Sequence, residues 1–242
     1  MRLIYNSKYE QIDQNISDGQ MGARKGKGCK HNIWIINGLI HETLKNKKKK
    51  PIVLQIYDYS QMFDSINLKE AHNDIFDYGL DDDNLPLVFK ANEEVQMAIK
   101  TLGGLTERQT IKNSVLQGDT FGSLLASVQV DSIAKDVEKA GVGLEYKDEM
   151  FVNILGLVDD MIGVSEVGFK AQIMNTILNF KSAEKGLQFG TNKCKMMIIG
   201  HNIENFRNNP VYVDCWKEEY IENSETGEIG CYVQENFCSN PL

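Results

Sequence analysis

The sequence FVNILGLVDDMIGV, residues 151–164, consists of two short apolar runs that meet at a pair of aspartates. Apolar runs of this length, joined by two residues with a turn-forming tendency, predict two antiparallel strands and a tight hairpin. On structural grounds alone, Asn-Gly or Asp-Gly would be expected at the tip, because adjacent carboxylates repel each other. Something must offset the repulsion between Asp159 and Asp160, and a divalent cation is the natural candidate.

A third carboxylate, Asp58, follows the sequence PIVLQIY of residues 51–57. This apolar, β-branched run predicts a buried strand, and an acid at the end of a buried strand is unfavourable unless it has a partner. If that strand lies beside the hairpin, three carboxylates meet at one place. They would form a site for two Mg²⁺ ions, as in phosphoryl and nucleotidyl transfer. An Asp-Asp pair alone is weak evidence, since Asp81 to Asp83 form a further acidic run that we interpret as a helix-capping loop.

The remaining pattern predicts an α+β domain in which helices cover one face of a largely antiparallel sheet. Hydrophobic periodicity predicts the end of a helix over 8–18 and helices over 31–45, 67–78, 83–99, 120–138 and 169–185. A further strand is expected over 194–199, and a hairpin over 99–113 with Gly103-Gly104 at its turn. After Gly200 the chain is polar and acidic, so we expect residues 201–242 to pack loosely.

The composition is that of an ordinary globular protein, with 42% hydrophobic and 25% charged residues in a chain of 242. No stretch approaches the ~20 apolar residues that a membrane span needs. The first residues, MRLIYNSKYEQ, lack the apolar region of a secretory signal. We therefore expect an intracellular protein with no membrane partner, whose five cysteines are reduced.

The formal net charge of −8 argues only weakly against a nucleic-acid partner, because binding depends on where the charge lies. Basic residues gather in two groups, Arg24 to Lys30 and Lys45 to Lys50, while much of the acid lies in the tail. A basic edge on an acidic body is one interpretation; a solvated lysine loop is an equal alternative.

Two other motifs are incomplete. The glycines around Lys27 are one residue short of a phosphate-binding loop, and the cysteines lack the spacing of a zinc site.

Five motifs, in order, resemble those of the reverse transcriptases of non-LTR retrotransposons. They are Gln20-x-Gly22-x-Arg24-x-Gly26, Asp58-x4-Phe63-Asp64-Ser65, Gln117-Gly118-Asp119 with Leu124-Leu125, Leu157-Val158-Asp159-Asp160, and Gly186-Leu187 with Lys193-Cys194-Lys195. Together they cover roughly residues 19–200. The ordered set is far more specific than any single motif.

The resemblance implies a right-hand polymerase palm, with an antiparallel sheet backed by helices, plus partial fingers. Residues 1–50 would be partial fingers, 51–200 the catalytic palm, and 201–242 a loosely packed extension toward a missing primer grip and thumb. We accordingly expect a fragment of a longer element-encoded protein. The implied activity is RNA-directed DNA synthesis, with an RNA template, a DNA primer and a deoxynucleoside triphosphate (dNTP) as partners, in the nucleus or cytoplasm.

The resemblance also assigns roles to individual residues. Asp58, Asp159 and Asp160 would bind two Mg²⁺ ions, with Mn²⁺ as an alternative, and Lys193 would donate a proton to pyrophosphate. The nucleotide would be contacted by the backbone around Tyr59, by Phe63 at the sugar, and by Gln117, Gly118 and Arg24. Alternatives from the residues alone are core packing for Phe63, a plain surface lysine for Lys193 and a solvated loop arginine for Arg24.

Two other functions stay open. One is another palm polymerase, such as an RNA-dependent RNA polymerase; Phe63 disfavours it, since its ring would fill the space of a ribose 2′-hydroxyl. The other is a catalytically inactive palm-fold remnant that binds nucleic acid. Departures from the motifs favour the remnant, among them Leu157-Val158 in place of an aromatic residue and Ala, whereas the three intact carboxylates oppose it. We expect this chain alone to have weak activity or none.

Overall fold

The centre of the fold is a six-stranded antiparallel sheet. The structure, a computed structural model, describes residues 2–46, 49–80, 83, 85–90, 95–111, 115, 121–147, 150–166, 168–190, 192–201, 216–218 and 230–235. In sheet order the strands are β11 (Trp216–Glu218), β12 (Gly230–Glu235), β10 (Lys195–Gly200), β1 (Ile52–Tyr57), β9 (Asp160–Glu166) and β8 (Ile154–Leu157).

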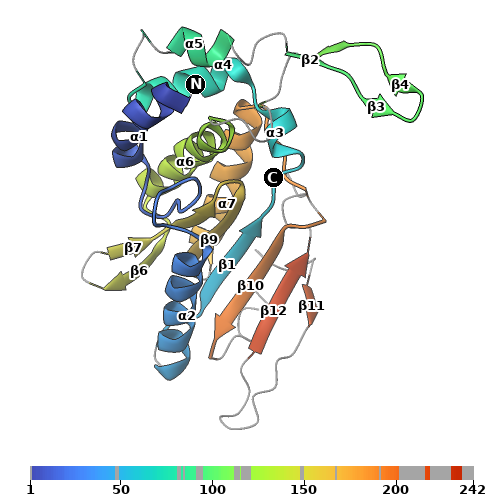
Figure 1. The fold of residues 1–242 in the computed structure, drawn as a ribbon. Helices are drawn as coiled ribbons and strands as arrows, with labels where there is room; N and C mark the ends of the chain where they lie inside the picture. The colour runs from blue at the N-terminus through green and yellow to red at the C-terminus, as the bar shows by residue number, and fades with distance from the viewer. Residues whose placement is uncertain are drawn as a thin grey trace.

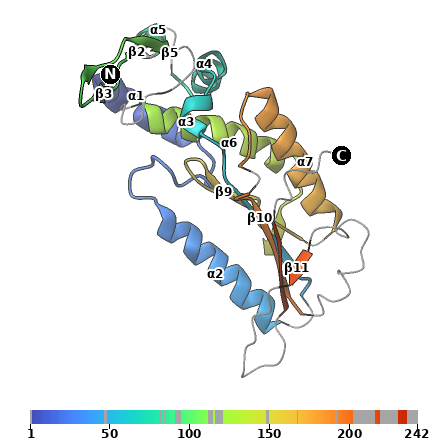
Figure 2. The same ribbon diagram turned by 90° about the vertical axis from the view of Figure 1, so that its right-hand side faces the viewer.

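Strand β1 is buried on both faces, which explains why its sequence is apolar without alternation. Val53 and Tyr57 belong to the larger core, while Ile52 and Leu54 belong to a second core on the opposite face of the sheet. Helices therefore cover both faces, not only one as the sequence predicted (Figure 2). The predicted fold class, mixed helices with an antiparallel sheet, is confirmed.

The larger core lies between the sheet and the helices α6 (Gly122–Ala140) and α7 (Phe169–Glu184) (Figure 1). Nearly every residue of the first half of α6 is buried, because α4 (Leu68–Asp77) packs on its outer side. The Asn67 side chain begins α4 by accepting hydrogen bonds from the backbone N–H groups of the first turn. The remaining helices on this side are α1 (Arg2–Asn15), α3 (Met62–Ser65) and α5 (Leu85–Lys90).

The second core is covered by one helix, α2 (Cys29–Lys45). Leu39 of this helix is buried in the same core as Ile52, Leu155 and Ile199 of the sheet. The Nε2 atom of His201 lies 2.7 Å from the carbonyl oxygen of Leu44, so it pairs one of the last carbonyls of the helix. A small hairpin of β6 (Leu144–Lys147) and β7 (Met150–Val152) packs beside this core.

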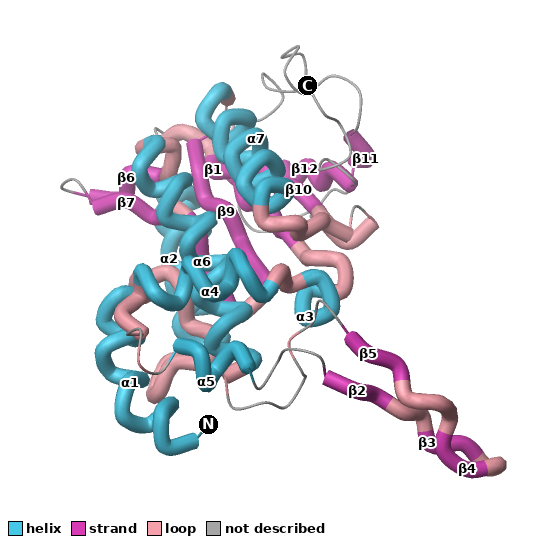
Figure 3. The backbone as a smooth tube through the Cα atoms, turned by 90° about the horizontal axis from the view of Figure 1, so that it is seen from above, coloured by secondary structure: helices cyan, strands magenta, loops and turns pink. Residues whose placement is uncertain are grey.

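An arm of four short strands projects from the body (Figures 1 and 3). Its strands are β2 (Val95–Met97), β3 (Lys100–Thr101), β4 (Gly104–Leu105) and β5 (Gln109–Ile111). The predicted hairpin is confirmed, but it starts earlier and turns at Leu102-Gly103. The helix predicted over 83–99 is wrong at its end, because Val95–Met97 pairs with Gln109–Ile111.

The other predicted elements are present, with small shifts of their ends. The hairpins β6–β7 and β11–β12 were not predicted; β12 pairs with β10 along the edge of the sheet. Within the described ranges, no helix has the length and apolar character needed to cross a bilayer.

Candidate active site

Asp58 directly follows β1 and lies at the end of the sheet where β9 begins. Tyr57 pairs with Met161 in the antiparallel register, so Asp58 continues toward Asp160. The loop before β10 holds Asp58 from the other side. The backbone N–H of Gly190 donates to the Asp58 carbonyl at 2.8 Å, and the Lys193 ammonium lies 3.0 Å from Asp58 Oδ1.

The hairpin between β8 and β9 turns through Val158 and Asp159, because Leu157 pairs with Asp160. The predicted tip, Asp159-Asp160, is thus one residue too late, and Asp160 is the first residue of β9. Of the two turn residues, Val158 has a positive φ of 62°. A positive φ at the first position is the pattern of a type II′ turn, which suits a two-residue hairpin.

Electrostatic coupling ties the three carboxylates and one ammonium together. Partial burial raises the pKa of the Asp160 carboxyl, and the charges of Asp159 and Asp58 raise it further. The hydrogen bond to Asp58 raises the pKa of the Lys193 ammonium, with further contributions from Asp160 and Asp159. Asp160 and Lys193 therefore each interact electrostatically with the other three groups at the end of β1.

The donor set suits a hard divalent cation in its chemistry, because it offers only carboxylate oxygens. The raised pKa of Asp160 points the same way, since a cation would offset both the burial of this carboxylate and its repulsion by Asp159 and Asp58. Among the described residues, no group of three or more His, Cys, Asp or Glu side chains is already gathered to hold a metal ion. Binding would require the three side chains to turn toward one another.

Two of the predicted nucleotide contacts, Tyr59 and Phe63, closely follow Asp58 in the sequence. The Tyr59 side chain is buried, donates or accepts a 2.8 Å hydrogen bond with Ser182 and stacks on Phe189, so only its backbone can face a nucleotide. Phe63 is half-buried against the larger core. Its carbonyl accepts a hydrogen bond from the N–H of Val115, which brings the next motif to this place. Gln117 and Gly118 themselves lie outside the described residues.

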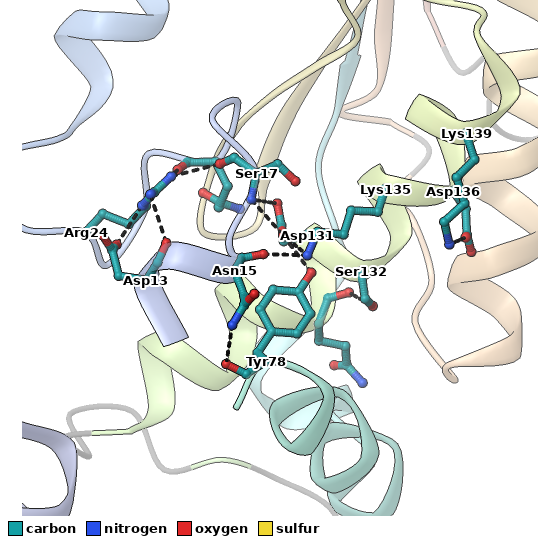
Figure 4. A network of polar contacts seen from close by, with 12 residues as sticks. Asp13, Asn15, Ser17, Arg24, Tyr78, Asp131, Ser132, Lys135, Asp136 and Lys139 are labelled. Carbon is teal, nitrogen blue, oxygen red and sulfur yellow. Dashed lines mark hydrogen bonds and ion pairs between the residues drawn. The ribbon is translucent and has the colours of Figure 1, made fainter. Parts of the chain in front are cut away.

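Arg24 has an internal role. Its side chain is only 6% exposed, and its guanidinium donates to Asp13 Oδ1 and to the carbonyls of Asp13, Ser17 and Gln20 (Figure 4). The alternative of a solvated loop arginine is therefore wrong. Because four of its hydrogen bonds are made within the protein, the structure offers the predicted phosphate contact of Arg24 no support.

Gln20 was not predicted to touch the site, yet its side chain forms hydrogen bonds with the backbone of the β8–β9 hairpin at Val158. A Cβ on Gly19 would lie 2.0 Å from the carbonyl oxygen of Ile154, and one on Gly22 would lie 2.1 Å from Val158 N. Two glycines three residues apart were therefore the available signal of close backbone approach.

Comparison with known proteins identifies the family. Residues 2–226 match the family model described as reverse transcriptase (RNA-dependent DNA polymerase). The chain belongs to the reverse transcriptase family. Enzymes of this family are RNA-directed DNA polymerases, a kind of nucleotidyltransferase. No curated protein matches the chain.

Solved telomerases share the fold of this reverse transcriptase chain. Apo telomerase from Candida tropicalis, truncated from the C-terminal domain, is 13% identical with a TM-score of 0.58, covering 81% of this chain and 40% of that one. Telomerase from Candida tropicalis in complex with a TWJ fragment of telomeric RNA is 12% identical with a TM-score of 0.60, covering 81% and 33%. The corresponding Candida albicans complex is 12% identical with a TM-score of 0.56, covering 82% and 34%. The chain thus spans well under half the length of these structures, and the likeness shows the palm fold.

Proposed function

We propose that this chain is the catalytic palm, with part of the fingers, of a reverse transcriptase of the non-LTR retrotransposon type. It would add deoxynucleotides to a primer 3′-hydroxyl on an RNA template. The observation that carries the proposal is the register of β1 and β9, which brings Asp58 to the start of the strand that follows Asp159. The proposed division is fingers over 1–50, palm over 51–200 and an extension over 201–242, in a protein of the nucleus or cytoplasm.

The residues would divide the chemistry as follows. Asp58, Asp159 and Asp160 would hold two Mg²⁺ ions, which supply positive charge for the primer hydroxyl and the triphosphate when bound. The Lys193 ammonium, which lies 3.0 Å from Asp58 Oδ1, would donate a proton to the leaving pyrophosphate. Phe63 would exclude a ribose 2′-hydroxyl, and the backbone near Tyr59 would face the triphosphate.

RNA as a partner is supported by the fold, since a telomerase with the same fold was solved with an RNA fragment bound. The motif order favours the non-LTR type within the family. A second candidate, a palm that binds nucleic acid without catalysis, is favoured by one observation. Val158 adopts a conformation that β-branched residues rarely adopt, at the position where the resembling motif has Ala.

Primer extension with Mg²⁺ on poly(rA)/oligo(dT) tests the proposal. Asp159→Asn should reduce incorporation by the whole chain by on the order of 10²-fold or more, because it removes a charge from the metal ligands. Asp83→Asn is the matched control, an exposed aspartate outside the site, and should leave incorporation unchanged. Equal incorporation by the wild type and Asp159→Asn would remove the catalytic role and favour the nucleic-acid-binding remnant.

A further inference from the structure

The turn that carries the proposed catalytic aspartates is strained at one residue. Val158 has a φ of 62°, in the left-handed region that is unfavourable for a β-branched side chain. Such a conformation persists only where the surrounding structure determines it. Asp159 is the next residue, so the peptide plane between the two residues helps to set the direction of the Asp159 side chain.

One side chain pairs both backbone polar groups of this strained residue. Gln20 Oε1 accepts the N–H of Val158 at 3.0 Å, and Gln20 Nε2 donates to the Val158 carbonyl at 3.1 Å. The same Oε1 accepts the N–H of Gly22 at 2.8 Å. Because two N–H donors face the oxygen and a carbonyl faces the nitrogen, the amide has one favourable orientation. Gln20 is only 3% exposed, so little water competes for these bonds.

The backbone around Gln20 lies against β8 like an additional parallel strand. Gly156 N–H donates to the Gly19 carbonyl, and Met21 N–H donates to the Gly156 carbonyl, both at 2.9 Å. A Cβ on Gly156 would lie 2.8 Å from Gln20 Nε2. The glycines therefore permit the approach that brings the Gln20 amide onto the turn.

This segment is anchored to the palm helix α6 (Figure 4). Arg24 donates to the carbonyls of Ser17 and Gln20, and the Ser17 N–H donates to both carboxylate oxygens of Asp131 at 3.1 and 3.2 Å. Asp131 is fully buried and also accepts the Tyr78 hydroxyl at 2.6 Å. The position of Gln20 is thus fixed relative to the helix that packs under the sheet.

We propose that Gln20 is a positioning residue: its amide holds Val158 at its positive φ and thereby fixes the backbone that carries Asp159 and Asp160 at the end of the sheet where Asp58 lies. Arg24 supports this role through the Gln20 carbonyl. The inference rests on the proposed function, whose carboxylates it orients, and it gives the segment before α2 a role in catalysis that requires no contact with substrate.

The test compares the whole chain with Gln20→Ala, Val158→Gly and the double variant. Amide hydrogen exchange of residues 154–162 measures the turn, and Mn²⁺ binding by electron paramagnetic resonance measures the carboxylates without requiring activity. Gln20→Ala should speed exchange in this peptide about tenfold, weaken Mn²⁺ binding about tenfold and lower primer extension on the order of 10- to 100-fold. In the Val158→Gly background the same change should have a much smaller effect, since glycine adopts this φ without strain.

The matched control is Gln55→Ala, which removes an equally buried glutamine that donates to the Ala171 carbonyl instead of to the turn. It should lower the melting temperature without weakening Mn²⁺ binding or speeding exchange of the turn. Unchanged exchange or unchanged Mn²⁺ affinity in folded Gln20→Ala would overturn the inference. So would an equal effect of Gln20→Ala in both backgrounds. If no protein extends a primer, catalysis by this chain alone fails, while exchange and Mn²⁺ binding still decide the role of Gln20.

Discussion

Asp160 is a residue whose ionised form the fold disfavours. Its pKa is raised by burial and by two neighbouring carboxylates. A carboxyl whose folded-state pKa is raised contributes stability that is fully present below the ordinary pKa of 3.8 and is lost as the pH rises through the raised value. At neutral pH, without a cation, the ionised Asp160 therefore destabilises the protein.

Asp160→Asn should accordingly raise the melting temperature of the metal-free protein at pH 7, while removing primer extension. The rise should be small, on the order of 1–2 °C, because the carboxyl is mostly exposed and screened by solvent. This rise in melting temperature should vanish as the pH falls through the folded-state pKa of Asp160 toward 3.8. Saturating Mg²⁺ should stabilise the wild type more than the variant. Thermal unfolding with and without Mg²⁺ checks this; a melting temperature that falls in Asp160→Asn at pH 7 would contradict it.

Among the elements, α4 and α7 are joined by an ion pair between Asp74 and Lys185, with N–O distances of 2.6 and 2.7 Å. Their side chains are only 10% and 16% exposed. Burial raises the pKa of Asp74 more than Lys185 lowers it. Desolvation therefore outweighs the attraction within the pair, as is common for buried ion pairs.

Removing one member of the Asp74–Lys185 pair should lower the free energy of unfolding far more than replacing both. Asp74→Asn should lower the free energy of unfolding by about 3 kcal/mol, because the Lys185 ammonium loses its partner while remaining buried. Asp74→Leu with Lys185→Met should cost less than about 1 kcal/mol, or stabilise the protein. Urea unfolding of the wild type, Asp74→Asn and the double variant measures both effects. A double variant less stable than Asp74→Asn would show that the pair is a net source of stability.

Some elements were predictable because their signal is local. Strand β1 is a continuous apolar run, and α2 and α7 have clear helical periodicity with ends close to those predicted. Val95–Met97 was predicted as helix because its strand depends on pairing with Gln109–Ile111, which periodicity does not report. The hairpin tip was misplaced by one residue, because a strained Val158 is an improbable turn residue by sequence rules.

The site was predictable only in part, because some of its contacts join residues that are far apart in the sequence. Asp58, Asp159 and Asp160 have apolar flanks that make their charge conspicuous, whereas the partner of Gln20 lies 138 residues away in sequence. Arg24 has a nearby partner in Asp13, but the three carbonyls that it also pairs exist only once the loop has formed. Hydrogen bonds from side chain to backbone leave no pattern in the sequence.

At the scale of the whole molecule, the body and the arm differ in how they are stabilised. The body buries two cores, one on each face of the sheet. The arm instead leaves apolar side chains open to solvent, with Leu102 and Leu105 111% and 73% exposed. Its tip belongs to neither core, so the fold of the body should not depend on it.

Replacing residues 98–108 by Asn-Gly tests this independence, because Met97 already pairs with Gln109 and a two-residue turn can join them. The free energy of unfolding should change by less than about 1 kcal/mol, since few contacts are lost and the loop is shorter. Self-association should decrease, because the exposed apolar tip is removed.

The β6–β7 hairpin provides the matched comparison. Leu144 and Val152 pack on the second core, so replacing both by Ser should lower the free energy of unfolding by about 2–4 kcal/mol. Urea midpoints and sedimentation velocity measure both effects, and a large loss of stability on shortening the arm would mean that the arm packs on the body in solution.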